Sequence, residues 1–234
     1  MNCLFPPAPA VLLPVAGSDQ VFPVRRVYCV GRNYAEHARE MGMPVEHGSP
    51  IFFCKPADAL VLPGQDPHFP SATDDLHHEI EWVLALGRDL ALSSAADAVL
   101  PAVIGHAVGL DLTRRDLQAK AKAKGQPWDS AKAFDDSAPI SALTLCPGDR
   151  LPTSGRLWLE VNDAPRQQGD LADMLLSPTE ILTELSKLFE LKAGDLIFTG
   201  TPAGVAALSA GDRYRAGLGD QCLLQGQMLA AKRG

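Results

Sequence analysis

The chain has 234 residues, of which 46% are hydrophobic and 21% are charged, and this balance is typical of a globular protein with one sizeable core. Its net charge of −7 argues against sequence-independent binding to nucleic acid, which needs a basic footprint, but allows a small anionic substrate. No apolar run approaches the ~18 residues of a membrane span, so we expect no membrane segment. No basic segment precedes the apolar N-terminus, so we expect no signal peptide.

Five cysteines without a C-x-x-C pair are more typical of reduced thiols than of a disulfide framework. This pattern predicts a cytoplasmic protein. Cys29 and Cys54 lie in apolar runs and are expected to be small core residues.

The first third of the chain predicts short strands around one helix. Residues 1–24 contain several prolines and are expected to form an irregular arm or a pair of short strands. A strand is expected over 26–30. Asn33, with Glu36 three residues later, has the spacing of a capping box and predicts a helix over 34–41.

The middle of the chain is richer in strands. Gly, Pro, His and Ser predict a mobile loop over 42–50. We expect strands over 51–54, 77–87 and 104–112, and an alanine-rich helix over 93–102.

The last part of the chain gives the clearest helix signal. Thr113 and Asp116 predict a helix start, and Lys124-Gly125 a helix end. A strand over 157–161 leads into the turn Asn162-Asp163. Residues 177–180 read Ser-Pro-Thr-Glu, a capping box with proline at the first helical position, and predict a helix ending near residue 190. After a strand over 196–199, further short strands and turns are expected.

Scattered helices among many strands predict an α+β fold rather than a regular βαβ succession. The absence of a repeat or a low-complexity linker predicts one domain. We divide the chain into an N-terminal extension, 1–24, and one globular domain, 25–234.

Three carboxylates form a candidate metal site. In a strand, Glu79 and Glu81 point to the same face, and Asp111 ends a second apolar run. Adjacent carboxylates on a covered face need a cation between them, and an all-oxygen set suits Mg²⁺, Mn²⁺ or Ca²⁺. The alternative is an edge strand whose outer face is wet.

His37 and Glu40 are candidates for acid–base chemistry. They are three residues apart on a predicted helix and therefore share a face. A carboxylate beside an imidazole orients it and raises its basicity, which suits a general base that activates water. The alternative is a surface pair.

Cations flank these groups in the sequence. Lys55 and Lys132 lie among apolar residues, and each is either a surface side chain or a buried cation facing carboxylates. Arg114, Arg115 and Gln118 follow Asp111 and either hold a substrate carboxylate or form a solvated helix face.

Other site types lack their motifs. No phosphate-binding glycine loop of the G-x-x-x-x-G-K-[ST] or G-x-G-x-x-G type occurs. The best match to a nucleophile elbow, residues 105–109, has alanine where serine is required, which argues against a serine hydrolase. His77 and His78 are adjacent and no other histidine stands at ligand spacing, which disfavours zinc.

Five motifs occur together in one order, and on them the chain resembles the fumarylacetoacetate hydrolase family, in particular its short acylpyruvate hydrolases. The residues around Phe22–Cys29 and Phe52–Pro56 are most similar to the fumarylpyruvate hydrolases of gentisate breakdown. The five motifs are YCVGRNY from Tyr28, HHEIE from His77, GLDLTRRD from Gly109, AKAF from Ala131 and FTGTP from Phe198.

The resemblance implies a mixed β-sandwich roll with peripheral helices, usually a homodimer, and a small dicarboxylate or 2-oxo acid substrate. It implies Mg²⁺ or Mn²⁺ as the cofactor, with Ca²⁺ as a possible substitute. The family's metal ligands match Glu79, Glu81 and Asp111, and its catalytic groups match His37, Glu40 and Lys132. Its substrate contacts match Arg32, Asn33, Tyr34, Lys55, Arg115, Gln118 and Thr201.

The implied activity is hydrolysis of the C–C bond of a 3-acylpyruvate. The Glu40–His37 pair would deprotonate a water that attacks the distal ketone, Lys132 would stabilise the oxyanion, and the loop 42–49 would close over the substrate. Two alternatives remain: 2-oxo acid decarboxylation or enol–keto isomerisation on the same scaffold, and a non-catalytic metal- or ligand-binding relative.

Overall fold

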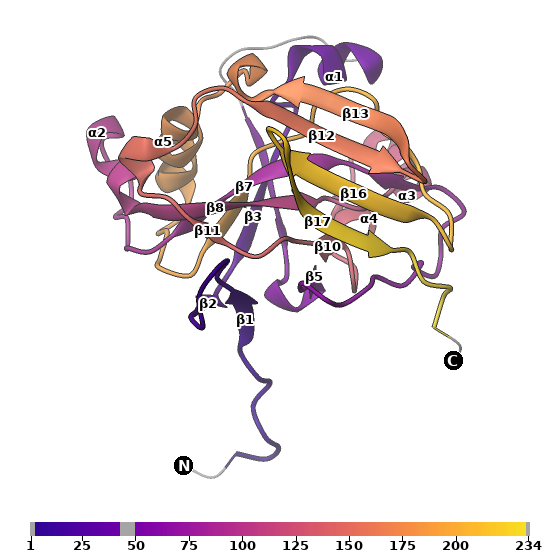
Figure 1. Ribbon diagram of the computed structural model, residues 1–234, viewed down its shortest axis with the longest axis horizontal. Helices are drawn as coiled ribbons and strands as arrows, with labels where there is room; N and C mark the ends of the chain where they lie inside the picture. Colours follow the sequence, from indigo (N-terminus) through magenta and orange to yellow (C-terminus); the bar gives the residue numbers. More distant parts are fainter. Residues whose placement is uncertain (1–2, 43–49, 233–234) are drawn as a thin grey trace.

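The computed structural model describes residues 3–42 and 50–232, and two packed β-sheets form its centre (Figure 1). The larger sheet has six strands in the order β11-β8-β7-β14-β3-β4. Its pairs are antiparallel except β14 with β3. Its strands, in chain order, are β3 (Val27–Gly31), β4 (Ile51–Lys55), β7 (Ile80–Leu86), β8 (Val103–Leu110), β11 (Thr144–Leu145) and β14 (Leu196–Phe198).

A four-stranded antiparallel sheet lies over one face of the larger sheet (Figure 1). Its first two strands are joined by the predicted turn, in which Asn162 and Asp163 both have positive φ, at 54° and 62°. The strands are β12 (Arg156–Val161), β13 (Ala164–Asp170), β16 (Arg213–Leu218) and β17 (Gln221–Gln227).

Strand β7 shows how the sequence builds two cores. All seven of its residues are buried, and their side chains alternate between the faces of the sheet. Trp82 and Leu84 pack into the core shared with the four-stranded sheet. Val83 and Ala85 pack into a second core on the opposite face, which the hairpin of β1 (Val11–Pro14) and β2 (Val21–Val24) helps to cover. Residues 11–24 therefore form the predicted pair of strands.

The strand predicted over 77–87 is interrupted at Glu79. Its first part, β6 (Leu76–His78), pairs with β9 (Thr113–Arg114) and β15 (Ala206–Ala207), whereas β7 pairs with β8 and β14. The chain changes sheets at Glu79, so no ladder holds this residue. A further parallel pair joins β5 (Leu60–Val61) to β10 (Ala138–Pro139).

Helices cover the edges of the sheets, and the prediction of an α+β fold is confirmed (Figure 1). The alanine-rich segment forms a shorter helix than predicted, followed by a 3-10 turn over Leu100–Ala102. None of the helices in residues 3–42 and 50–232 is long and apolar enough to span a membrane. The α-helices are α1 (Ala35–Glu40), α2 (Ala96–Val99), α3 (Arg115–Ala123), α4 (Asp129–Lys132) and α5 (Pro178–Leu188).

The predicted helix caps have different outcomes. Ser177 and Glu180 form the full capping box of α5, as predicted, although the helix ends at Leu188. Asn33 does not cap α1, whose N-cap is Tyr34, without a side-chain hydrogen bond. Thr113 lies in β9 instead of capping α3.

Two other predictions have mixed outcomes. Cys29 is buried as predicted, but Cys54 is exposed, so its assignment to the core was wrong. Its strand, β4, is the edge strand of the larger sheet, with one side uncovered. Residues 43–49 of the predicted mobile loop, and the closure predicted for them, lie outside the described residues.

Candidate active site

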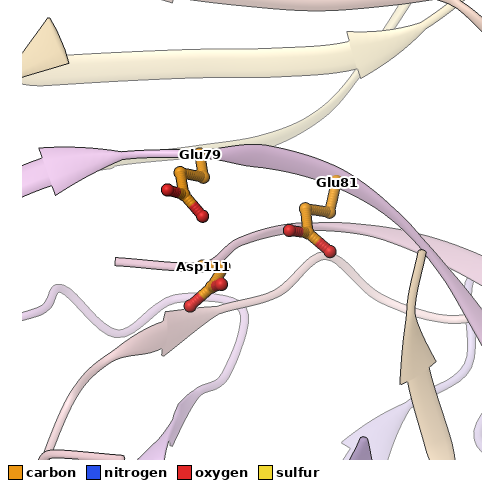
Figure 2. A group of neighbouring side chains, drawn as sticks. All are labelled: Glu79, Glu81 and Asp111. Atoms are coloured by element: carbon orange, nitrogen blue, oxygen red, sulfur yellow. The ribbon is translucent and has the colours of Figure 1, made fainter. Parts of the chain in front are cut away.

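The three predicted metal ligands meet where the chain passes between sheets. Glu79 lies between β6 and β7, Glu81 lies on β7, and Asp111 follows β8. The backbone N–H of Asp111 donates to the carbonyl of Glu79 at 2.8 Å, which holds the two segments together. One oxygen from each carboxylate lies within 4.8 Å of the others, and all three side chains are buried (Figure 2). The alternative of a wet edge strand is therefore wrong.

Two of the carboxylates are neutralised by buried cations. The Nζ of Lys132 donates to Glu79 at 2.7 Å and to Asp111 at 2.5 Å. Arg115 also donates to Glu79, and Lys55 Nζ lies 2.9 Å from Asp111. Burial alone would raise the pKa of Glu79, but Lys132 and Arg115 outweigh it and hold that pKa far below its usual range. For Lys132, burial is likewise outweighed by Asp111 and Glu79, and its pKa is raised.

Glu81 differs from the other two carboxylates. It accepts a hydrogen bond from the backbone N–H of Gly200 at 2.8 Å, and it has no ion pair within the described ranges. Burial, followed by repulsion from Asp111 and Glu79, raises the pKa of Glu81 well above its usual range. The triad therefore carries a carboxylate whose charge is not balanced. Together with its all-oxygen donor set, this imbalance fits a hard divalent cation such as Mg²⁺ or Mn²⁺.

Gly200 is required by the local geometry. Its φ of +97° disfavours other residues, and a Cβ there would lie 2.7 Å from the Cβ of Asn33. Glycine thus lets the backbone N–H approach Glu81 while the chain passes close to Asn33.

His37 and Glu40 lie on one face of α1, as predicted. His37 Nδ1 lies 3.4 Å from Glu40 Oε2, and both carboxylate oxygens of Glu40 accept from the backbone N–H of Gly204 at 3.1 Å. The imidazole is buried, and burial lowers the pKa of His37 despite the opposing effects of Glu79 and Glu40. A neutral imidazole held by a fixed carboxylate can accept a proton.

One cavity, called here the site cavity, brings most of the predicted residues together. Two residues hold groups of this cavity from outside it: Gly200 donates to Glu81, and Glu40 pairs with His37. The predicted site residues that line it are Arg32, His37, Glu79, Glu81, Asp111, Arg115, Gln118, Lys132 and Thr201.

Three predicted substrate contacts do not line the site cavity. Asn33 donates to the carbonyls of Thr199 and Leu176 and accepts from the N–H of Leu176. Lys55 donates to the carbonyls of Leu112 and Ser137 at 3.1 Å each, as well as to that of Lys132. The hydroxyl of Tyr34 is buried, with no hydrogen-bond partner among the described residues. Asn33 and Lys55 therefore hold segments beside the cavity, through Thr199 and Lys132, and do not line it.

Sequence reasoning missed several residues of the site. Phe53, Lys122 and Trp128 line the cavity. Gln167 holds two parts of the wall: its amide nitrogen donates to Thr201 Oγ1 at 2.9 Å, and its amide oxygen accepts from the N–H of Ile80 at 3.0 Å. Gln167 comes from a polar stretch of β13 without a recognisable motif, whereas the spacing of Lys122 from Arg115 could have pointed to it.

The mixed-sheet fold, the buried carboxylate triad and the neighbouring His–Glu pair define an enzyme site. Residues 26–229 match the family model described as Fumarylacetoacetate (FAA) hydrolase C-terminal, and the chain belongs to this family.

Relatives within this family are named for different activities. The chain is 44% identical over 194 residues to the oxaloacetate tautomerase YcgM of Escherichia coli (strain K12). The aligned region covers 82% of this chain and 87% of the relative. The chain is 39% identical over 196 residues to the mitochondrial oxaloacetate tautomerase FAHD1 of Bos taurus, covering 83% and 87%. The crystal structure of fumarylpyruvate hydrolase from Pseudomonas aeruginosa, in complex with Mn²⁺ and pyruvate, superposes with a TM-score of 0.92 at 45% identity, covering 98% of this chain and 100% of that chain.

Proposed function

We propose that this protein hydrolyses the C–C bond of a 3-acylpyruvate, with fumarylpyruvate as the substrate and fumarate and pyruvate as the products. The observation that carries the proposal is the buried His37, which is fixed by Glu40 and lines the same cavity as the carboxylate triad, and whose pKa is lowered by burial. Hydrolysis needs a base that activates water, and this pair supplies one. The similarity to the Pseudomonas aeruginosa fumarylpyruvate hydrolase supports the acyl group.

Glu79, Glu81 and Asp111 would hold Mg²⁺ or Mn²⁺, and Ca²⁺ could take the same oxygen ligands. When bound, this ion supplies Lewis-acid polarisation and orientation of the 2-oxo acid group. Lys55, Lys132 and Arg115 hold Glu79 and Asp111 in place through their ion pairs.

The protein's own groups would then carry the proton transfers. His37 takes a proton from a water, whose oxygen bonds to the carbon of the distal ketone. Lys132 stabilises the negative charge that develops on the ketone oxygen. When the C–C bond breaks, its electron pair passes to the pyruvate fragment, and protonated His37 returns a proton to the carbon that has lost its acyl group. Arg32 and Thr201 line the cavity, where they would bind the substrate oxygens.

Oxaloacetate tautomerisation is the second candidate. Two relatives with 44% and 39% identity are oxaloacetate tautomerases, and a Dictyostelium discoideum relative with 36% identity is an oxaloacetate decarboxylase. Tautomerisation needs only removal and return of a proton beside a carbonyl, which His37 can perform without activating water.

The deciding experiment follows the ultraviolet absorbance of fumarylpyruvate and acetylpyruvate, with chelator-stripped protein and added Mg²⁺ or Mn²⁺. We expect metal-dependent loss of fumarylpyruvate, with fumarate and pyruvate formed in stoichiometric amounts. His37→Ala should lose this activity but still bind the metal. Turnover of enol-oxaloacetate without any C–C cleavage would favour tautomerisation instead. Thermal stabilisation by these compounds without any product would indicate a binding protein.

The biological setting is part of the same proposal. We place the protein in aromatic catabolism through gentisate, in the cytoplasm, as a homodimer with a small-molecule substrate and without nucleic-acid or membrane partners.

A further inference from the structure

Lys122 is a cation of the site cavity for which the proposed chemistry has no use. It lies on α3, seven residues after Arg115 and four after Gln118, so the three side chains share one helix face, and all of them line the cavity. Arg115 and Gln118 are joined by a hydrogen bond of 2.7 Å, and Arg115 also donates to the metal ligand Glu79. Lys122 is thus the member of this face farthest along the helix from the triad.

The distance along this face matters for the substrate. A rise of 1.5 Å per residue separates Arg115 and Lys122 by about 10 Å along the helix axis. A ligand whose 2-oxo acid end lies at the triad would therefore extend toward Lys122 with its other end.

Among the described residues Lys122 is not ion-paired, and the carboxylate of Glu79 acts on it only at longer range. It has no carboxylate partner within salt-bridge range in the described part of the chain, and its Nζ lies 5.1 Å from the ring centroid of Trp128. Burial, followed by repulsion from Arg115 and Arg32, lowers the pKa of Lys122 to about 8. Half-buried positive charges that repel one another stabilise a bound anion between them.

The apolar wall beside Lys122 suits a flat carbon chain. The rings of Phe53 and Trp128 are 6.3 Å apart at a tilt of 58°, and both line the cavity. A conjugated acyl segment could pack against these rings and end at Lys122.

We propose that Lys122 binds the terminal carboxylate of the acyl group, with Phe53 and Trp128 packing on the chain that leads to it, and so selects acylpyruvates that are dianions. This inference rests on the proposed function and adds a specificity-determining residue to it. A monoanionic acylpyruvate such as acetylpyruvate would leave Lys122 without a partner.

The matched pair of variants is Lys122→Met and Lys120→Met. Lys120 lies on the same helix and is exposed, with its Nζ 3.9 Å from Asp116. With Mn²⁺-loaded protein, Lys122→Met should lower kcat/KM for fumarylpyruvate by roughly tenfold to a hundredfold, mainly through KM, because a charge-assisted contact is lost. Its effect on acetylpyruvate should be under threefold. Lys120→Met should change neither value, and Lys122→Arg should restore part of the loss.

A binding measurement tests Lys122 apart from turnover. Calorimetric titration of the Mn²⁺-loaded protein compares 2-oxopimelate with 2-oxoheptanoate, which have the same chain length and differ only in the terminal carboxylate. We expect the wild type to prefer 2-oxopimelate at least tenfold and Lys122→Met to lose this preference. An unchanged preference in Lys122→Met, or an equal loss for both substrates in the kinetic assay, would overturn the inference. If the wild type hydrolyses neither acylpyruvate, the proposed function fails while the titration still decides the role of Lys122.

Discussion

The carboxylates of Glu79 and Glu81 are two residues apart and equally buried, but they face opposite electrostatic conditions. Glu79 has Lys132 and Arg115 as partners, and Glu81 has a single backbone N–H from Gly200. The pKa of Glu79 is lowered and that of Glu81 is raised. One carboxylate therefore stabilises the metal-free fold and the other destabilises it.

This contrast predicts opposite effects of one substitution at the two positions. In metal-free protein at pH 7, Glu81→Gln should raise Tm by a few degrees, since 1 kcal/mol shifts Tm by about 2–4 °C in a chain of this size. Glu79→Gln should lower Tm, because breaking a buried ion pair costs up to about 3–5 kcal/mol. Thermal unfolding in the presence of a chelator measures both.

The effects of both substitutions should depend on pH. A carboxyl group with a raised folded pKa destabilises the protein increasingly as pH rises above its unfolded value of about 4.3. The gain from Glu81→Gln should therefore vanish below that pH. The stability that Glu79 contributes is present above the same unfolded value and is lost as pH falls, so the loss from Glu79→Gln should also shrink in acid. Shifts of the same sign at pH 7 would contradict this account.

The pH dependence of catalysis should report the protonation of His37. As a general base it must be neutral, and burial lowers the pKa of His37 below its ordinary 6.5. The acidic limb of kcat/KM at saturating Mn²⁺ should therefore lie below pH 6.5. Because Glu40 raises the pKa of His37, Glu40→Gln should move this limb to still lower pH and reduce the plateau rate. The pH–rate profile of Glu36→Gln, an exposed residue on the same helix, should match wild type. A limb above pH 6.5, or an upward shift in Glu40→Gln, would count against His37 as the base.

At the scale of elements, local patterns predicted what local forces decide. The Ser177 capping box formed because its partners lie within the same four residues. Asn33 has a similar spacing to Glu36, but its amide bonds to backbone groups of Thr199 and Leu176, far along the chain. The break at Glu79 likewise depends on which strands pair with its two sides, and no periodicity of the sequence carries that information.

Asn33 should contribute more to stability than a helix cap does. Its side chain joins the start of α1 to two distant loops with three hydrogen bonds, one of them to the carbonyl just before Gly200. Asn33→Ala would leave these largely buried backbone groups unpaired, at about 1–3 kcal/mol each for those that water cannot reach. We expect it to lower the free energy of unfolding more than Ser177→Ala, which removes a cap worth about 1 kcal/mol. Urea unfolding compares the two variants.

A second readout separates Asn33 from an ordinary stabilising residue. Because Gly200 N–H holds Glu81, movement of this loop should also weaken Mn²⁺ binding in Asn33→Ala but not in Ser177→Ala. An equal loss of stability with unchanged Mn²⁺ affinity would show that Asn33 does not position the triad.

In the whole molecule, the site forms where the chain passes from the small sheet of β6, β9 and β15 into the six-stranded sheet. The change from β6 to β7 frees Glu79 from the ladder, and the end of β8 brings Asp111 beside it. Family motifs predicted the triad and the His–Glu pair, which the fold brings into one region. They did not predict Gln167, which acts through positions that only the folded chain brings together. They did not include Lys122 either, although its spacing from Arg115 on α3 could have pointed to it. A net charge of −7 likewise conceals the cluster of cations around the cavity.

A metal ion that binds only the folded state stabilises the whole fold against unfolding. Mn²⁺ at about one hundred times its Kd should add about 2.7 kcal/mol, which corresponds to a rise in Tm of roughly 5–10 °C. Glu81→Gln should lose this rise, so the variant that is more stable without metal becomes the less stable one when Mn²⁺ is present. Glu36→Gln removes an exposed carboxylate that pairs with Arg39 and takes no part in the charge balance of the triad. This variant should keep the full rise. An equal Mn²⁺ shift in Glu81→Gln would mean that the ion stabilises the protein from another place, and the unbalanced carboxylate would need a different explanation.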